Sequence, residues 1–400
     1  MVLPLDFHHY FEYLLKRDVT KLYIAIAIRN LALGMVLLFE PIYIYLFFGE
    51  SLPLTILFFA VIYGMYGVLA PFSGMIMGKI GPTKTILISL FLYFSYYLAL
   101  FFLPQSLWLL PLAIILAVFA MLLFWTAFDT DFARFSSRQS RGGDVGKLNV
   151  MKLFPMIVAP VIGGWILVVF GYPVLFMMVL VVLLASTIPL FYSKETHEVY
   201  TDSYKEAWKR MWKKENVLPS IGFAANSVET VIAFLFWPLF MFLLATSFDA
   251  MGAISSFALV ISALFMLYVG KVSDTQERPW LLNVGALWTG ISWVIKFFVG
   301  TTFDALLAHT LYRISRSAAA VPFGTFFYER AAAKGPETDE FVVNRQIIQG
   351  VSRGVFLLLA AAAFWIVPNL PLQAVFFVAA VLSLGFMFSG KLPFSFNRHG

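Results

Sequence analysis

Long apolar runs, separated by short polar breaks, recur along the whole 400-residue chain. A helix needs about 20 apolar residues to cross a bilayer, and cutting the chain at its turns and charge clusters predicts about twelve such spans. We place them at 21–48, 52–77, 83–103, 107–128, 149–170, 173–193, 217–246, 250–270, 279–300, 303–328, 344–367 and 370–390. Only 12% of the residues are charged, against about 25% in soluble domains. The sequence therefore predicts an all-α integral membrane protein.

Lysine and arginine are confined to alternate connections between these spans. The breaks at 48–53, 104–106, 171–173, 246–250, 301–304 and 368–371 contain neither residue. Basic loops of membrane proteins face the cytoplasm. The pattern therefore predicts a protein of the cell or inner membrane with both termini in the cytoplasm, which requires an even number of spans. It also explains the net charge of +6 without a nucleic-acid partner.

Related sequence features recur about half the chain apart. The turns at 74–84 and 270–280 each follow the second apolar span of a half, and Phe39-Glu40-Pro41 matches Phe236-Trp237-Pro238 at nearly the same offset. Transporters built from paired halves bind substrate between them near the bilayer midplane. We expect two pseudo-symmetric six-helix bundles, 1–193 and 217–400, around a central cavity.

The connection at 194–216 is predicted to be a cytoplasmic linker. Ser203 and Glu206 have the spacing of a capping box, which starts a helix. In the helix that follows, the aromatic residues Tyr204, Trp208 and Trp212 fall with Met211 on one stripe and the lysines lie on other faces. It is therefore predicted to be amphipathic and to lie at the cytoplasmic membrane surface.

This topology, together with two short motifs, resembles the major facilitator superfamily. The family's turn after its second helix is Gly-x-x-x-Asp-Arg-x-Gly-Arg-Lys, and the resemblance implies that this turn latches one half against the other during alternating access. The first copy here has Gly74, Gly78, Lys79, Gly81 and Lys84, and the second has Gly270, Asp274 and Arg278. Because Gly78 stands where the family has aspartate, the resemblance implies a weakened latch in the first half.

The fifth predicted span resembles the family's antiporter motif, which ends Gly-Pro-x-x-Gly-Gly. The matching residues are Pro160, Gly163 and Gly164, with Ala159 in place of one glycine. The resemblance implies exchange or export. The alternative is that proline and glycine kink this helix and permit close packing.

Seven charged residues interrupt the apolar spans: Arg29, Glu40, Glu229, Lys296, Arg313, Arg316 and Arg353. Each costs about 2.5–3.5 kcal/mol at the centre of a membrane helix, so we expect them to face a cavity or each other. The family lines its cavity with the first, fourth, seventh and tenth helices, and most of these charges lie on the first, seventh and tenth. Lys296 is different, because it lies near the outer end of its span and is predicted to snorkel toward the interface.

One face of the predicted helix 303–328 is polar along its length. His309, Tyr312, Arg313 and Arg316 have the spacing i, i+3, i+4, i+7, which places them on one side of a helix. The functional interpretation is an anion-binding or proton-linked stripe. The alternative is a structural ion-pair network between the two halves.

The two candidate carboxylates lie on the first and seventh spans. Glu229 is one turn from Asn226 and near mid-membrane, which makes it the candidate proton carrier. The alternative is a permanent salt bridge to Arg313 or Arg316. Arg29 and Glu40 are about three turns apart and share a face. Gln349 and Arg353, four residues apart, are expected to join the same cavity.

Enzymatic interpretations find no support in the sequence. The chain has no Gly-x-x-x-x-Gly-Lys-Ser/Thr phosphate loop, no cysteine, and five scattered histidines without metal-ligand spacing. We therefore expect no catalytic activity, no cofactor and no metal.

The sequence favours a monomeric secondary transporter, in contact with lipid, that moves a small organic solute, anionic or amphipathic, by alternating access and with protons as the coupling ion. The first alternative is a lipid or lysolipid flippase of the same fold. The second is a non-transporting receptor or scaffold, which requires Arg29, Glu229, Arg313 and Arg316 to be locked in pairs.

Overall fold

The structure is a computed structural model that describes residues 18–135, 141–192, 200–212, 214–273 and 278–390. Every regular element within these ranges is a helix. The first half contains α2 (Asp18–Val36), α3 (Glu40–Phe47), α4 (Leu52–Ile80), α5 (Pro82–Phe102), η1 (Leu103–Gln105), α6 (Leu109–Phe135) and α7 (Arg141–Phe191), and α8 (Tyr204–Met211) follows it. The second half contains α9 (Lys214–Val231), η2 (Ile232–Phe236), α10 (Trp237–Leu243), α11 (Phe248–Ser273), α12 (Arg278–Phe297), α13 (Thr302–Ala333), η3 (Gly335–Glu337), α14 (Thr338–Ile366), α15 (Ala374–Leu384) and η4 (Gly385–Gly390).

These elements form the twelve predicted passes. Seven described helices are long and apolar enough to cross a membrane, and α2 with α3, bent by 41°, makes an eighth. α7 counts once in that number, although the non-helical backbone of Gly171, with φ 77°, divides it into two helices. One of the seven, Pro219–Leu243, runs through α9, η2 and α10 as a single pass. The described α12, α13 and α15, which continues into η4, lie outside that count and supply the remaining three passes. The predicted fold class is confirmed.

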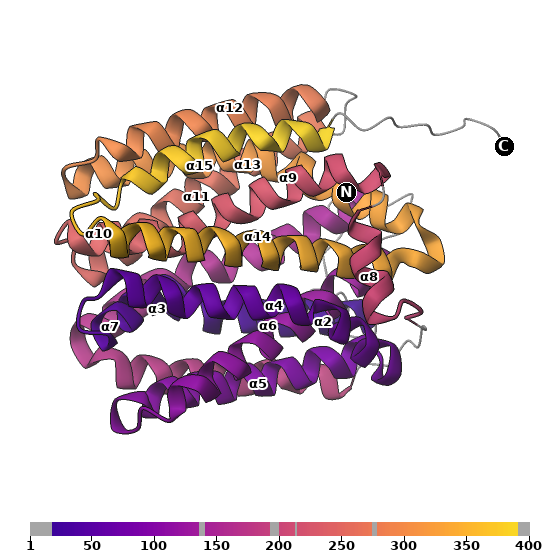
Figure 1. The fold of residues 1–400 in the computed structure, drawn as a ribbon, viewed down its shortest axis with the longest axis horizontal. Helices are drawn as coiled ribbons and strands as arrows, with labels where there is room; N and C mark the ends of the chain where they lie inside the picture. The colour runs from indigo at the N-terminus through magenta and orange to yellow at the C-terminus, as the bar shows by residue number, and fades with distance from the viewer. Residues whose placement is uncertain (1–17, 136–140, 193–199, 213, 274–277, 391–400) are drawn as a thin grey trace, which may run out of the picture.

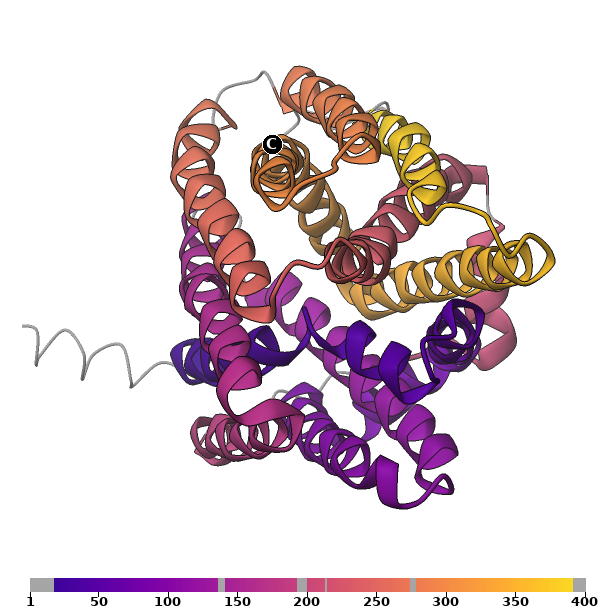
Figure 2. The ribbon, with the colours of Figure 1, turned by 90° about the vertical axis from the view of Figure 1, so that its left-hand side faces the viewer.

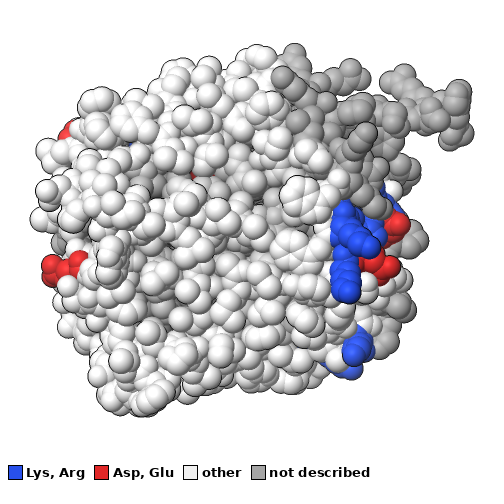
Figure 3. Space-filling view, in the orientation of Figure 1, with Lys and Arg blue, Asp and Glu red and all other residues white. Residues whose placement is uncertain are grey.

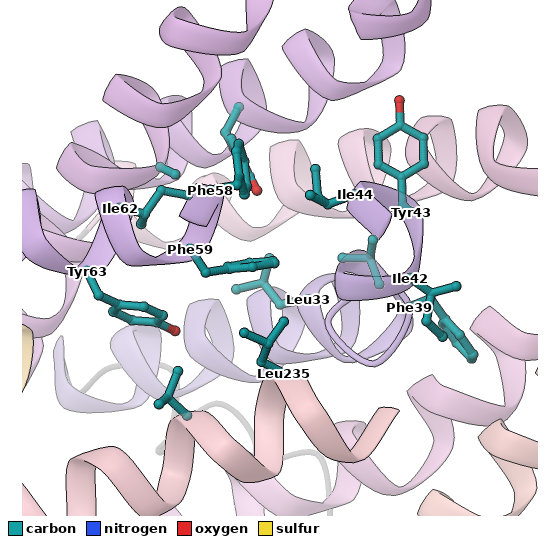
Figure 4. Packing of buried hydrophobic residues seen from close by; sticks show 14 of the residues in the cluster. Leu33, Phe39, Ile42, Tyr43, Ile44, Phe58, Phe59, Ile62, Tyr63 and Leu235 are labelled. Carbon is teal, nitrogen blue, oxygen red and sulfur yellow. The ribbon is translucent and has the colours of Figure 1, made fainter. Parts of the chain in front are cut away.

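The helices lie in two groups that meet along two seams. Figure 1 shows α2 to α7 on one side and α9 to α15 on the other, with α4 beside α14 where they meet. The view from the end of the bundle shows the second seam, between α7 and α11 (Figure 2). Between the two halves, Leu235 of η2 packs with three residues of the first half, Leu33 of α2 and Phe59 and Tyr63 of α4 (Figure 4).

Glycines bring the backbones at both seams into contact. A Cβ added to Gly67 of α4 would overlap the backbone of Gly350 and Val351 of α14. At the other seam, a Cβ on Gly164 would overlap Phe248 of α11. Gly163 faces Met35 of α2, and the Pro160 carbonyl lies against Gly252. Small residues allow helices to approach this closely in membranes. Pro160, Gly163 and Gly164 of the fifth-span motif therefore lie at close helix contacts, which is the packing role given above as the alternative interpretation.

Charge on the visible surface gathers at the ends of the bundle. Figure 3 shows lysine and arginine at one end, with a white, uncharged side between the two ends. We call this the basic end; it holds the exposed Lys79, Lys84, Lys205 and Lys209. The other end, where α5 meets η1 and α12 meets α13, is called the opposite end. An uncharged belt between polar ends suits a membrane-spanning bundle.

Candidate functional site

Glu229 is the centre of a buried polar network in the second half. Its side chain is 0% exposed, and its carboxylate accepts hydrogen bonds from Trp293 Nε1 at 2.9 Å, Tyr312 Oη at 2.8 Å and Arg316 Nε at 3.0 Å. The π-helical η2 begins three residues after it and leads directly into Trp237. Such π-bulges are frequent at functional sites because they re-aim side chains within a helix.

Arg316 joins this network to the preceding turn of α9. Its guanidinium also donates to Asn226 Oδ1. The structure therefore brings together Asn226, Glu229, Tyr312 and Arg316, and the ion pair of Glu229 is with Arg316. Arg313 forms no ion pair with a described carboxylate, and its buried Nε has no hydrogen-bond partner in the described part of the chain.

Lys296 does not snorkel, contrary to the sequence-based prediction. Its side chain is 0% exposed, and Nζ lies over three aromatic rings, 4.0 Å from the centroid of Trp237, 4.1 Å from that of Trp293 and 3.7 Å from that of Tyr312. The prediction used only the position of Lys296 near the end of its span, which does not define the side of the helix that it occupies. The rotation of α12 instead points the amine at α10 and α13. His309 stacks on Trp237, with ring centroids 5.6 Å apart.

Arg29 and Glu40 lie in the first half and are separate from each other. The Arg29 guanidinium stacks over Phe124, 3.4 Å from the ring centroid, and forms no ion pair with a described carboxylate. Glu40 accepts hydrogen bonds from Tyr96 Oη at 2.9 Å and Tyr97 Oη at 2.8 Å. The two tyrosines are on α5, which the sequence did not single out, because a tyrosine in an apolar span is also common in a plain core.

Gln349 and Arg353 lie on α14 and contact Ser227 of α9, the residue after Asn226. The Ser227 hydroxyl donates to the Gln349 carbonyl at 3.0 Å, and Arg353 Nε donates to the Ser227 carbonyl at 3.2 Å. The Arg353 guanidinium also faces the ring of Tyr63 on α4, at 5.1 Å. Arg353 therefore links the two halves instead of joining the Glu229 network.

A second polar network closes the basic end between the halves; the sequence allowed either gating ion pairs or ordinary solvated charges at this end of the fourth span, and did not identify the partners of Asp129. Asp129 of α6 accepts hydrogen bonds from Tyr328 at 2.9 Å, Arg345 at 3.0 Å and Gln346 at 3.1 Å. Gln346 in turn accepts from Tyr66 of α4. The sequence signal was weak, because Asp129 and Arg345 lie near the ends of their predicted spans, where solvated charges are ordinary.

Aromatic contacts join the halves toward the opposite end. Phe39 packs against Phe248 at 5.8 Å between ring centroids, and Phe59 packs against Phe234 at the same distance. The described helices are therefore in contact across the boundary on both sides of the buried networks.

Residues 22–337 match the family model of the Major Facilitator Superfamily. The chain belongs to the major facilitator superfamily. This superfamily and its fold are those of secondary transporters, so the predicted integral membrane setting holds.

Solved structures of the superfamily have the same fold. The transporter FucP in its outward conformation matches with a TM-score of 0.68 and 12% identity, over 94% of this chain and 99% of that chain. The human organic anion transporter MFSD10 (TETRAN) matches with the same values. A variant of the E. coli fucose:proton symporter FucP has a TM-score of 0.62 and 14% identity, over 92% of this chain and 96% of that one. Comparison with curated proteins found no match. At these identities the likeness shows the fold alone.

The first superfamily turn is filled by the segment before α8. A Cβ on Gly74 would lie 2.6 Å from the ring of Tyr200, and one on Gly78 would lie 2.9 Å from its Cβ. Gly81 has φ 87° and lets the chain turn into α5, while Lys79 and Lys84 are exposed. Tyr200 thus occupies the place beside position 78 where an acidic side chain would project. In the second copy, Asp274 lies outside the described residues, between Gly270 on α11 and Arg278, which begins α12.

The segment 200–212, which we call the strap, contacts both halves at the basic end. Thr201 donates from its backbone nitrogen and hydroxyl to Glu340 of α14, at 3.0 and 2.7 Å. Tyr204 donates to the carbonyl of Val68 on α4 at 3.1 Å. The predicted capping box between Ser203 and Glu206 is confirmed.

Arg210 fixes the end of the strap. Its guanidinium binds both oxygens of Asp202 at 2.8 Å and Glu337 at 2.9 Å. The hydrogen bonds that Arg210 donates to Asp202, aided by the one to Glu337, hold the pKa of Arg210 above its ordinary value. α8 therefore packs on the helices of both halves, where the sequence predicted only a linker helix at the membrane surface.

Proposed function

We propose that this chain is a secondary active transporter that carries a small organic anion by alternating access. The observation that carries the proposal is the charge of the buried network. Lys296, Arg313 and Arg316 lie close to one carboxylate, Glu229, which already accepts three hydrogen bonds. Buried charges in membrane helices mark substrate or ion pathways, and an excess of cations favours an anionic cargo.

We infer that protons drive this transport through Glu229. A carboxylate that gains a proton loses its attraction for Arg316, and the guanidinium is then available to a substrate anion. Protonation of Glu229 therefore favours binding of the substrate anion at Arg316, and this linkage between proton and substrate is the requirement for coupling. The basic end faces the cytoplasm in this proposal, because basic loops are retained there, and both termini lie on that side. We propose a monomer as the transporting unit, because one chain contains both halves and the contacts between them at both ends.

The scaffold alternative fits the contacts less well. It requires Arg29, Glu229, Arg313 and Arg316 to be paired, whereas only Glu229 and Arg316 form an ion pair with each other. Arg29 and Arg313 each keep a buried nitrogen without a hydrogen-bond partner among the described residues. Burying a cation without hydrogen-bond partners costs free energy. Charged residues that are kept inside a membrane bundle despite this cost are typically functional.

Flux measurements in proteoliposomes test the proposal. An imposed pH gradient is expected to drive uptake of a mixture of organic acids, detected by mass spectrometry. Arg313→Ala and Glu229→Gln are expected to abolish uptake while each variant still folds, which a cooperative melting transition in detergent will show. Lys205→Gln, on the exposed face of α8, is the matched control and keeps full flux.

Two results would contradict the proposal in different ways. Full uptake by both variants would remove the site assignment. Uptake that ignores the pH gradient would leave a uniporter and remove the coupling through Glu229.

A further inference from the structure

Lys296 has an unusual environment for a lysine inside a membrane bundle. Its side chain is 0% exposed, and Nζ has no hydrogen-bond partner within the described ranges. Three rings surround the amine, from Trp237 of α10, Trp293 of α12 and Tyr312 of α13. Cation–π contacts stabilise a desolvated ammonium, but they leave its N–H donors unused.

Two more buried nitrogen atoms without partners among the described residues lie near Lys296. His309 stacks on Trp237 and Tyr312, two of the rings that surround the amine, and its Nδ1 has no partner among the described residues. Arg313 follows Tyr312, lies within electrostatic range of Lys296, and has an unpartnered Nε. Buried polar groups are normally hydrogen-bonded, so three buried nitrogen atoms without partners among the described residues, on side chains that share the rings of Trp237 and Tyr312 or adjoin them, require an explanation.

Glu229 does not supply the missing acceptor. Its two oxygens accept from Trp293, Tyr312 and Arg316. Trp293 and Tyr312 thus present their polar edges to Glu229 and their faces to Lys296. The aromatic side chains separate an anionic position, held by the protein, from a cationic position that has no anion of its own.

We propose that Lys296, His309 and Arg313 form an anion subsite that binds the carboxylate of an aromatic acid. The carboxylate accepts from the three nitrogen groups, and the aromatic body of the ligand packs against the rings of Trp237 and Trp293. This assignment rests on the proposed transport of organic anions and narrows its substrate class. It also places a binding residue on α12, a helix outside the predicted cavity set.

Ligand binding to the purified full-length protein in detergent tests the subsite without any need for transport. The probes are benzoate, its neutral counterpart benzyl alcohol, and the non-aromatic anion cyclohexanecarboxylate, each titrated by calorimetry. Benzoate is expected to bind at least about tenfold more tightly than benzyl alcohol, because only an anion receives charge-assisted hydrogen bonds from these groups. It is also expected to bind more tightly than cyclohexanecarboxylate, because only the ring of benzoate is aromatic and can stack on Trp237 and Trp293. Inorganic phosphate, which represents a lipid headgroup, is expected not to compete.

Variants assign the binding to the named side chains. Lys296→Gln is expected to weaken benzoate binding at least about tenfold, whereas Lys296→Arg keeps most of it and Lys205→Gln keeps all of it. Arg313→Gln gives a second measurement if Lys296→Gln does not fold, which its melting temperature will show.

The subsite is overturned if benzoate does not bind, if benzyl alcohol binds equally well, or if the Lys296 and Arg313 variants bind as the unaltered protein does. Displacement of benzoate by phosphate would instead identify a headgroup site and also reject the proposal. The proposed transport function fails by a different result, the absence of organic-acid flux in proteoliposomes, so the two failures are distinguishable.

Discussion

Glu40 and Glu229 are both buried carboxylates, but their partners differ. Glu40 accepts from two tyrosine hydroxyls and has no ion pair with a described cation, whereas Glu229 is paired with Arg316. Hydropathy identified both residues, since a charge in an apolar run is visible in the sequence. Their partners were not predictable, because an apolar helix carries no pattern that defines its rotation. Lys296 was misplaced for that reason.

The tyrosine pair around Glu40 predicts a measurable stability effect. Tyr97→Phe removes one of the two donors and leaves a buried carboxylate oxygen unsatisfied, which costs about 1–3 kcal/mol. The melting temperature in detergent is expected to fall. Tyr192→Phe, at an exposed position, is the control and leaves it unchanged. Equal melting temperatures for both variants would show that the hydrogen bond from Tyr97 contributes nothing.

The first and seventh passes both depart from regular helix beside their buried carboxylates, Glu40 and Glu229. α2 and α3 are separated by a bend of 41° just before Glu40, and η2 separates α9 from α10 just after Glu229. The sequence showed the matching Pro41 and Pro238, and proline disrupts a helix one turn before itself. The number and position of the passes could be predicted from hydropathy. The form of each break could not be predicted, because it depends on how the helices pack.

At the seam between α4 and α14, two glycines one turn apart give a matched pair of variants. Gly67→Ala would overlap the backbone of Gly350 and Val351, whereas a Cβ on Gly64 has nothing within 4 Å. Overpacking costs about 1–3 kcal/mol. Gly67→Ala is therefore expected to lower the melting temperature, and Gly64→Ala to leave it nearly unchanged. Equal effects of the two variants would argue against a tight seam at this point.

The whole molecule is closed at its basic end by two independent devices. The Asp129 network joins α6 to α13 and α14, and the strap joins α4 to α14 through Tyr200 and Thr201. The resemblance to the superfamily located the turn at Gly74 and Gly78 from the sequence. It could not show that Tyr200 fills the space, because that contact joins segments more than a hundred residues apart. We expect Gly78→Asp to displace the strap and favour opening of the basic end.

Alternating access is the central claim, and the absence of cysteine in the chain makes it directly measurable. Spin labels on cysteines at Lys79 and Ala333 report the basic end, and labels at Leu107 and Phe303 report the opposite end; all four positions are exposed. Pulsed electron resonance in lipid nanodiscs gives both distance distributions. The account predicts that each pair shows two distances, that one lengthens as the other shortens when benzoate or pH is varied, and that Gly78→Asp lengthens the first pair. Single, unchanging distances at both ends would contradict it and favour a scaffold.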